Sequence, residues 1–317
     1  MNGGATLAAL VREIHRVRNT AEPSCVLRPR HATPTPPDQP VGVLLLKPSS
    51  GYIPPATLAA ILDRLTGPYG YAIEAAHWWS GPDLQRAKLM ARHYPGFFRV
   101  AHGGWPALGK PARGLLTATA NSVGSRFQAR FGAPFAPDLV RTPYDLIADG
   151  FAAEWLNHLW EQDRSGEQEP LARVQRLDED SLALGLRFDR GPSVPERWHH
   201  RGVILLNGFF AQLERDFETH GCVALCLRRR PDSTTSWEAL RTRFAGKTNP
   251  FEAPAGTVRG DAARGVLPVE RVSVLANVIH LSANEAEGRR EVEGVWWNPE
   301  LLPQVFGEVS PRRSRGP

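Results

Sequence analysis

Val41-Gly-Val-Leu-Leu-Leu46, followed by Lys47 and Pro48, is the stretch on which the fold depends. A continuous apolar run of this length is typical of a strand that is buried on both faces. Pro48 has no N–H to donate to a sheet, so the strand ends there. The sequence therefore predicts a central strand over 41–46 that presents a lysine at its end.

Apolar spacing outward from this strand predicts the remaining elements. The N-terminal residues 1–19 have the pattern of an amphipathic helix rather than a signal peptide. Further strands are expected over 71–79, 222–227 and 272–279, and helices over 57–65, 83–94, 209–218, 237–244 and 286–296. This order predicts an α/β (α+β) domain in which an antiparallel sheet carries helices packed on one side, the ferredoxin-like or split βαβ class.

Composition shifts divide the chain into four parts. Residues 1–40 hold the first helix and a proline-rich arm that cannot form a helix or a central strand. The predicted domain is discontinuous and covers 41–95 and 208–306. Residues 96–207 are rich in Gly, Pro and Trp, contain one predicted helix over 144–162, and are expected to form an inserted subdomain. A basic tail covers 307–317.

Composition also excludes some classes of protein. Of the 317 residues, 42% are hydrophobic, which is typical of a soluble globular protein, and no run reaches the roughly 18 apolar residues of a membrane helix. The net charge of +5 is modest, and the arginines occur in short clusters, so neither a nucleic acid nor a membrane is expected as a partner. Three cysteines favour a reducing, cytoplasmic location.

The segment Asn277-Val-Ile-His280-Leu-Ser282 carries the clearest chemical signal. Strand alternation is expected to place Asn277 and His280 on opposite faces, and Ser282 with Glu285 has the spacing of a capping box at a helix N-terminus. Glu291 follows nine residues after Ser282. A histidine held by hydroxyl and carboxylate partners has a fixed tautomer and a second nitrogen that can act as a nucleophile. A purely structural histidine is the alternative.

A second segment, Gly246–Pro250 followed by Pro254–Asp261, combines turn residues with Thr248 and Arg259. A hydroxyl and a guanidinium fork on such a loop suit phosphate binding. The alternative is an ordinary turn capped by Thr and Asp side chains.

Taken in order, these stretches resemble the landmarks of the nucleoside diphosphate kinase family. The matching motifs are LLLKP, ARHY, GKTNP, AGTVRGD, NVIHLS, the glutamate at 291 and GVWWNPELL. The resemblance covers about residues 41–95 and 208–306. It implies the ferredoxin-like fold of that family, with residues 96–207 as an insertion.

The resemblance implies a role for each matching residue. His280 accepts a phosphoryl group and passes it on, while Ser282 and Glu291 orient its imidazole. Lys47 and Tyr94 flank the transferred group. The nucleotide contacts implied are Lys47, Phe210, Arg243, Thr248, Arg259, Val274 and Asn277; the family's phosphate-binding arginine aligns with Thr242, so Arg241 is the alternative to Arg243. The resemblance implies no protein-held metal, because Mg²⁺ is held by phosphates and water.

We therefore expect a phosphotransferase that uses a nucleoside triphosphate such as ATP and Mg²⁺, and that forms a homo-oligomer. Its acceptor is expected to be a nucleotide or a nucleoside-like molecule, with the insertion favouring a specialised one. Leu281, Ala283 and Gly96 stand where the family has a glycine and two acids. They favour the alternative of a catalytically silent nucleotide-binding module whose insertion binds a partner. A third possibility is a different transferase that binds a nucleotide in the same cleft.

Overall fold

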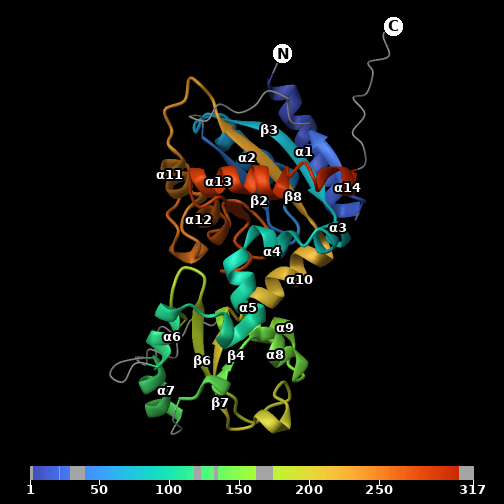
Figure 1. Ribbon diagram of the computed structural model, residues 1–317. Helices are drawn as coiled ribbons and strands as arrows, with labels where there is room; N and C mark the ends of the chain where they lie inside the picture. The colour runs from blue at the N-terminus through green and yellow to red at the C-terminus, as the bar shows by residue number, and fades with distance from the viewer. Residues whose placement is uncertain are drawn as a thin grey trace. The chain divides into compact units, whose positions relative to one another are not determined.

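The computed structural model describes residues 3–20, 22–28, 40–117, 123–131, 135–161 and 174–306. It divides into two compact units, of which the first contains Met1–His93 and Asp216–Pro317, and the second contains Tyr94–Arg215 (Figure 1). The sequence placed the ends of the insertion at 96 and 207. The predicted tail 307–317 and most of the proline-rich arm lie outside the described residues. No helix in the described ranges is long and apolar enough to cross a bilayer.

The first unit is built on a five-stranded sheet in the order β1-β3-β8-β2-β9. The strands are β1 (Cys25–Arg28), β2 (Val41–Leu46), β3 (Tyr71–Trp79), β8 (Cys222–Arg229) and β9 (Ile279–Leu281). Every pair of neighbours is antiparallel. Without the edge strand β1, the spatial order is that of a split βαβ sheet, and α2 (Pro55–Thr66) connects β2 to β3. The prediction of an α+β fold with an antiparallel sheet is confirmed.

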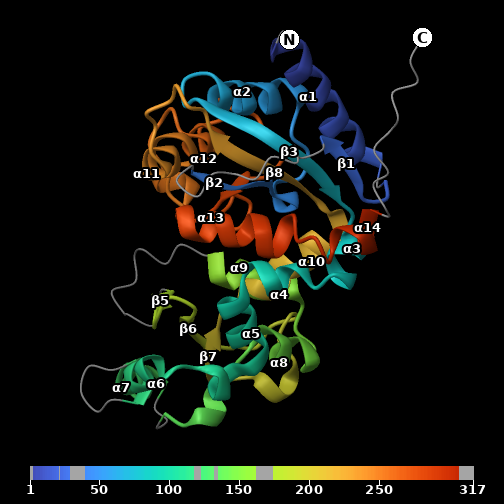
Figure 2. The same cartoon turned by 45° about the horizontal axis from the view of Figure 1, so that its top comes forward.

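The central strand β2 is buried along its whole length, as its uninterrupted apolar sequence predicts. Leu44 and Leu46 belong to the core that the sheet forms with α1 (Gly3–Thr20) and α2. From α1 this core takes Leu10, Val11, Ile14 and Val17. Figure 2 shows α1 and α2 on one side of the sheet and α13 (Glu285–Glu291) on the other. The expectation of helices on one side only is therefore wrong, because a strand that is apolar on both faces needs cover on both.

Several predicted helices are interrupted in the structure. The helix expected over 83–94 is divided into α3 (Gly81–Arg86) and α4 (Leu89–His93), because Lys88 has a positive φ of 50°. The helix α11 (Trp237–Ala239) continues as a π-helical segment, Leu240–Ala245, and α13 continues as another, Val292–Trp296. The remaining helices of the C-terminal half are α10 (Phe210–His220), α12 (Val258–Ala263) and α14 (Leu302–Phe306).

The strand predicted over 272–279 is wrong except at its end. Only Ile279–Leu281 pairs with β2, and the preceding residues form a loop. Val278 has φ 68°, which no strand residue adopts, so the expected alternation of faces across 277–280 is lost. The expected capping box is wrong too. The side chain of Asn284 caps α13 by accepting from Glu287 N at 2.8 Å, while Ser282 bonds elsewhere.

The second unit has a sheet of its own, which the sequence did not predict. Its strands, in the order β4-β7-β6-β5, are β4 (Val140–Arg141), β7 (Gly202–Leu206), β6 (Leu182–Arg187) and β5 (Gln175–Arg176). Its other helices are α5 (Pro95–Ala107), α6 (Lys110–Thr117) and α7 (Val123–Phe131). The helix predicted over 144–162 is divided at Gly150, with φ 101°, into α8 (Pro143–Ala148) and α9 (Ala153–Glu161).

The close packing around Gly42 in β2 predicts a stability effect. A methyl group at this position would overlap the buried ring of Trp237 and lie 3.2 Å from Ser282 Oγ. We expect Gly42→Ala to lower the free energy of unfolding by about 1–3 kcal/mol, the usual cost of overpacking. Urea unfolding measures it. Gly294→Ala is the matched control, since a methyl group there has no neighbour within 4 Å. Equal stabilities of the two variants would contradict the described packing.

Candidate active site

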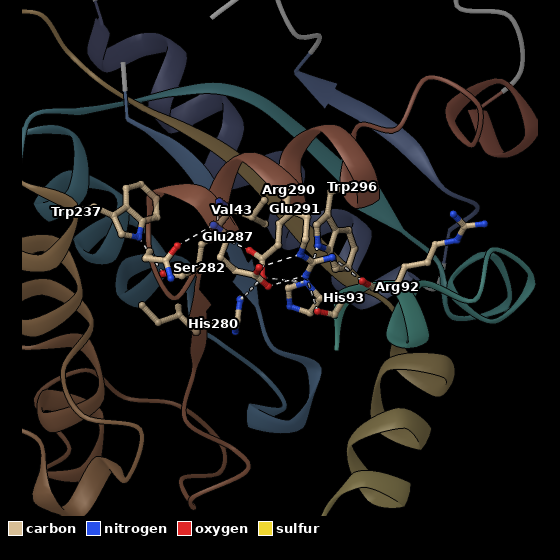
Figure 3. A network of polar contacts seen from close by, with 12 residues as sticks. Val43, Arg92, His93, Trp237, His280, Ser282, Glu287, Arg290, Glu291 and Trp296 are labelled. Atoms are coloured by element: carbon tan, nitrogen blue, oxygen red, sulfur yellow. Dashed lines mark hydrogen bonds and ion pairs between the residues drawn. The ribbon is translucent and has the colours of Figure 1, made fainter. Parts of the chain in front are cut away.

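A buried carboxylate, Glu291, lies at the centre of a polar network in the first unit (Figure 3). Only 1% of Glu291 is exposed. Ser282 Oγ donates to its Oε2, and His280 Nε2 lies 3.3 Å from its Oε1. His93 Nδ1 lies at the same distance from Oε1. Burial raises the pKa of this carboxyl group, and the contacts with His93 and Ser282 act against that rise.

Ser282 connects the network to the sheet. Its hydroxyl accepts a hydrogen bond from Val43 N at 2.9 Å, and its carbonyl accepts one from Trp237 Nε1 at 2.9 Å. Ser282 therefore fixes the end of β9 against β2 while it donates to Glu291. The sequence predicted the partnership of Ser282 with Glu291 and placed the serine at the wrong structural position, as a helix cap.

His280 lies on β9 opposite Leu45 of the central strand. Its side chain is 18% exposed, so the ring can be reached from solvent. Burial, followed by the positive charges of Arg259 and Lys47, lowers the pKa of His280 to about 3. The imidazole is thus neutral near pH 7. A neutral imidazole that donates from Nε2–H to Glu291 Oε1 has its lone pair on Nδ1.

His93 is a member of the network that the sequence did not predict. It is buried, its ring packs edge-on against that of His280 at 4.5 Å between centroids, and Trp296 Nε1 donates to its Nδ1 at 3.2 Å. The guanidinium of Arg290 donates to the carbonyls of Arg92 and His93 and so holds this end of α4. The position of His93 beside Tyr94 in the ARHY motif is the sequence feature that could have identified it.

The side chains of Lys47 and Asn277 contact each other, and the Lys47 charge acts on His280. Lys47 Nζ donates to Asn277 Oδ1 at 3.1 Å and to the carbonyl of Leu275. Asn277 Nδ2 donates to the carbonyls of Thr248 at 2.9 Å and Val274 at 3.0 Å. Lys47 is only 6% exposed. Lys47 thus connects the 272–278 loop to the end of β2, and Asn277 connects the same loop to Thr248.

Arg259 likewise connects two backbone segments. Its Nη1 donates to Gly246 O at 2.8 Å, and its Nη2 donates to Ile279 O at 2.9 Å, one residue before His280. It is 9% exposed, and its charge is one of the two largest that lower the pKa of His280. The structure therefore brings together Lys47, Arg259, Asn277, His280, Ser282 and Glu291, all from the predicted set.

The backbone of Val278, two residues before His280, is strained. A φ of 68° is an outlier for a β-branched residue. Two hydrogen bonds hold it there, because Val278 N donates to Ser50 Oγ at 2.9 Å and Val278 O accepts from Lys47 N at 2.9 Å. Strain that is held in this way is common where a side chain has to be aimed into a functional site.

Arg241, rather than Arg243, lies near the histidine. The charge of Arg241 contributes to the lowered pKa of His280, whereas the charge of Arg243 acts on the phenol of Tyr69. The carbonyl of Arg243 also accepts a hydrogen bond from Tyr69 Oη at 2.6 Å. Which of the two arginines contacts phosphate remains a prediction.

The other predicted site residues lie outside the network. Thr248 is exposed, and Val274 is exposed on the 272–278 loop. Tyr94 and Phe210 belong to the second unit, where their rings contact edge to face at 6.4 Å and Phe210 is buried. Their roles at the nucleotide remain predictions.

His93, His280 and Glu291 are also the one trio of His, Cys, Asp or Glu side chains in the described ranges whose ligand atoms approach within 4.8 Å of one another. Two imidazoles and a carboxylate are ligand types of zinc. However, Trp296 already donates to His93 Nδ1 and Ser282 to Glu291, which are hydrogen bonds that a metal would have to displace. The donors present suit a hydrogen-bonded network better than a resident metal.

Comparison with known proteins identifies a resemblance over part of the chain. No family model matches the chain. A stretch of 92 residues is 36% identical to the nucleoside diphosphate kinase of Brevibacillus brevis, and the match covers 29% of this chain. The chain contains a nucleoside diphosphate kinase-like domain. It spans about half (53%) of the length of that relative. An NDP kinase structure from Pyrobaculum aerophilum is 17% identical, with coverage of 84% of this chain and 99% of that one and a TM-score of 0.33.

The structure shows the surroundings of two residues at which the kinase-like domain departs from the family pattern. Leu281, in place of the glycine, pairs with Leu44 in the sheet and packs into the core. Ala283, in place of an acid, is exposed. Neither substitution removes a member of the Glu291 network.

The burial of His280 in the kinase-like domain predicts an unusual titration. We expect its ring to stay neutral from pH 8 to pH 5 in the folded protein, because its lowered pKa of about 3 lies well below that range. In the urea-unfolded chain the same ring should titrate near about 6.5. Protonation then favours the unfolded chain, so this histidine removes stability as the pH falls below about 6.5.

NMR of ¹⁵N-histidine-labelled protein measures this titration, with the resonance assigned by its loss in His280→Gln. The control is the unfolded sample in urea. A folded-state transition of the His280 resonance near pH 6.5 would contradict the proposed burial and charge environment.

Proposed function

We propose that the kinase-like domain moves the γ-phosphoryl group of a nucleoside triphosphate to His280, and from there to a nucleotide or nucleoside-like acceptor. The observation that carries this proposal is the neutral, reachable imidazole whose Nε2 lies against the buried carboxylate of Glu291. A phosphoryl-accepting histidine needs a lone pair on the attacking nitrogen, and a tautomer held by a hydrogen bond at Nε2 supplies one at Nδ1.

The proposed chemistry balances in two steps. In the first, the lone pair of His280 Nδ1 forms a bond to the γ-phosphorus, the bond from that phosphorus to the β,γ-bridging oxygen breaks, and the diphosphate leaves. The imidazole gains positive charge, which the Glu291 carboxylate stabilises through Nε2–H. In the second step an acceptor oxygen attacks the phosphorus, the N–P bond breaks, and the neutral imidazole is regenerated.

The surrounding charges support phosphoryl transfer, in which catalysis depends mainly on positioning and electrostatics. Lys47 and Arg259 lie close enough to His280 to lower its pKa, so both place positive charge where the phosphates are proposed to bind. Arg241 adds a third charge. Thr248 and Asn277 are proposed to contact the outer phosphates and the ribose. The donor is proposed to arrive as its Mg²⁺ complex, with the metal held by phosphates and water.

The acceptor is proposed to be a specialised one. The second unit begins at Tyr94, directly after His93, and ends at Arg215. An ordered unit of this size inside a domain is normally functional. Tyr94 and Phe210, which it contains, are proposed to contribute to the nucleotide site. Homo-oligomer formation and a cytoplasmic location remain parts of this proposal.

A second candidate is a nucleotide-binding module without catalysis. One observation favours it: Lys47 and Arg259 both donate to backbone carbonyls and are nearly buried. In that reading the two cations stabilise the loops and bind phosphate only after rearrangement. Nucleotide binding without phosphorylation of the protein would favour this candidate.

Phosphorylation of His280 is the test of the proposed function. With γ-labelled ATP and Mg²⁺, we expect one acid-labile, base-stable phosphate per chain. The label should be absent from His280→Ala and retained in His199→Ala, a matched control on the second unit. Label that persists in His280→Ala would place the nucleophile elsewhere.

Lys47→Met should weaken nucleoside triphosphate binding by about tenfold to a hundredfold, because a charge-assisted hydrogen bond contributes roughly 1.5–3 kcal/mol. Methionine keeps the length of the apolar stem and removes the charge. Calorimetric titration measures the affinity. The control is Lys247→Met, which removes an exposed lysine paired with Glu252. Equal affinity in both variants would argue against a phosphate contact of Lys47.

A further inference from the structure

A pocket in the first unit lies beside the turn that follows Lys47. Its volume is about 260 Å³, just below the range of roughly 300–1,000 Å³ that is typical for drug-sized ligands. Residues from α1, from the Pro48–Ile53 turn, from the end of α10 and from the 270–271 segment line it. The helix α1 lies outside the segments that resemble the kinase family.

The lining is rich in cations and hydrogen-bond donors. The ionisable and aromatic side chains that line it are His15, Arg18, Tyr52, His220, Glu270 and Arg271. Glu270 is the one acid among the lining residues, and its carboxylate already accepts Tyr52 N at 2.7 Å. In the described part of the chain, neither Arg18 nor Arg271 makes an ion pair.

Arg18 is the least compensated charge in this lining. Burial lowers its pKa to about 10, and no carboxylate contributes to that pKa. Its guanidinium donates to two backbone carbonyls, Leu46 O at 3.2 Å and Gly51 O at 2.8 Å. A guanidinium has five N–H donors, and a buried charge is normally paired with an opposite one. A partly buried cation that borders an open pocket and lacks an acidic partner favours an anionic occupant.

We propose that this pocket binds a small oxyanion, either free phosphate or the phosphate group of a small metabolite, between Arg18 and Arg271. The planar fork of a guanidinium suits the tetrahedral oxygens of phosphate. The hydroxyl of Tyr52 and the rings of His15 and His220 line the same space. Tyr52 Oη lies 3.2 Å from His15 Nε2, and His220 Nδ1 lies 3.2 Å from Asp216 O. Such a site can operate without phosphoryl transfer at His280.

The site also has a direct physical connection to Lys47. The two carbonyls that Arg18 contacts belong to residues on either side of the Lys47–Ser50 segment. Gly51 has φ 65°, and a methyl group on it would overlap Glu270, so this turn is closely packed. An anion that fixes the Arg18 guanidinium therefore stabilises the segment that presents Lys47.

Titration of inorganic phosphate into ¹⁵N-histidine-labelled protein, at constant pH and ionic strength, tests the proposal. The ring resonances of His15 and His220, assigned by substitution, should shift and saturate. Glycerol phosphate run in parallel distinguishes the two sources, since tighter binding of the ester identifies a metabolite and equal or weaker binding identifies free phosphate.

Variants decide whether the shifts come from this pocket. Arg18→Gln should weaken the phosphate response by about tenfold or more, the effect of removing one charge-assisted contact. Arg271→Gln, on an exposed residue, gives the same test if Arg18→Gln fails to fold. Arg12→Gln removes an exposed arginine from the same helix outside the pocket, and it should leave the response unchanged.

Two outcomes would overturn the proposal. One is the absence of saturable shifts at His15 and His220 in the wild-type protein. The other is a response that persists in Arg271→Gln or disappears in Arg12→Gln, because the anion would then bind elsewhere.

Discussion

The buried carboxylate of Glu291 is the constraint on which the site depends. A carboxylate that is almost fully removed from water is costly unless donors surround it. Ser282 supplies one donor and His280 a second, and His93 lies at the same distance from Oε1 as His280 does. Ser282 Oγ also accepts a hydrogen bond from Val43 N. The serine that donates to the carboxylate therefore also fixes β9 against the central strand. The orientation of the imidazole therefore follows from the packing of the sheet.

The central strands could be predicted from the sequence because their signals are local. The apolar runs of β2, β3 and β8 specify buried strands, and the order of elements leaves few topologies open. The 272–278 loop was missed for a physical reason. Val272, Val274 and Val278 suggest a strand, but a hydrogen bond from Val278 N to Ser50 Oγ and one from Lys47 N to Val278 O hold Val278 at a positive φ. Tertiary contacts of this kind override local propensity.

The site could be predicted only in part. The motifs identified His280, Ser282, Glu291, Lys47 and Asn277, which the structure brings together. They did not identify His93, because its contact with His280 depends on how α4 packs against the Val292–Trp296 segment. They also left Arg241 and Arg243 open, because the family's phosphate-binding arginine aligns with Thr242, which lies between them. In the sheet of the second unit, β4 and β5 have only two residues each, too few for a pattern in the sequence to predict a strand.

The central claim is that Glu291 holds Nε2 of His280 so that Nδ1 is the phosphoryl acceptor. NMR of ¹⁵N-histidine-labelled protein after reaction with ATP and Mg²⁺ tests it most directly, because the nitrogen shifts and the nitrogen–phosphorus coupling identify the phosphorylated atom. The account predicts phosphate on Nδ1 of His280, with Nε2 still protonated. Phosphate on Nε2, or an unmodified His280 in a protein that binds the nucleotide, would contradict it.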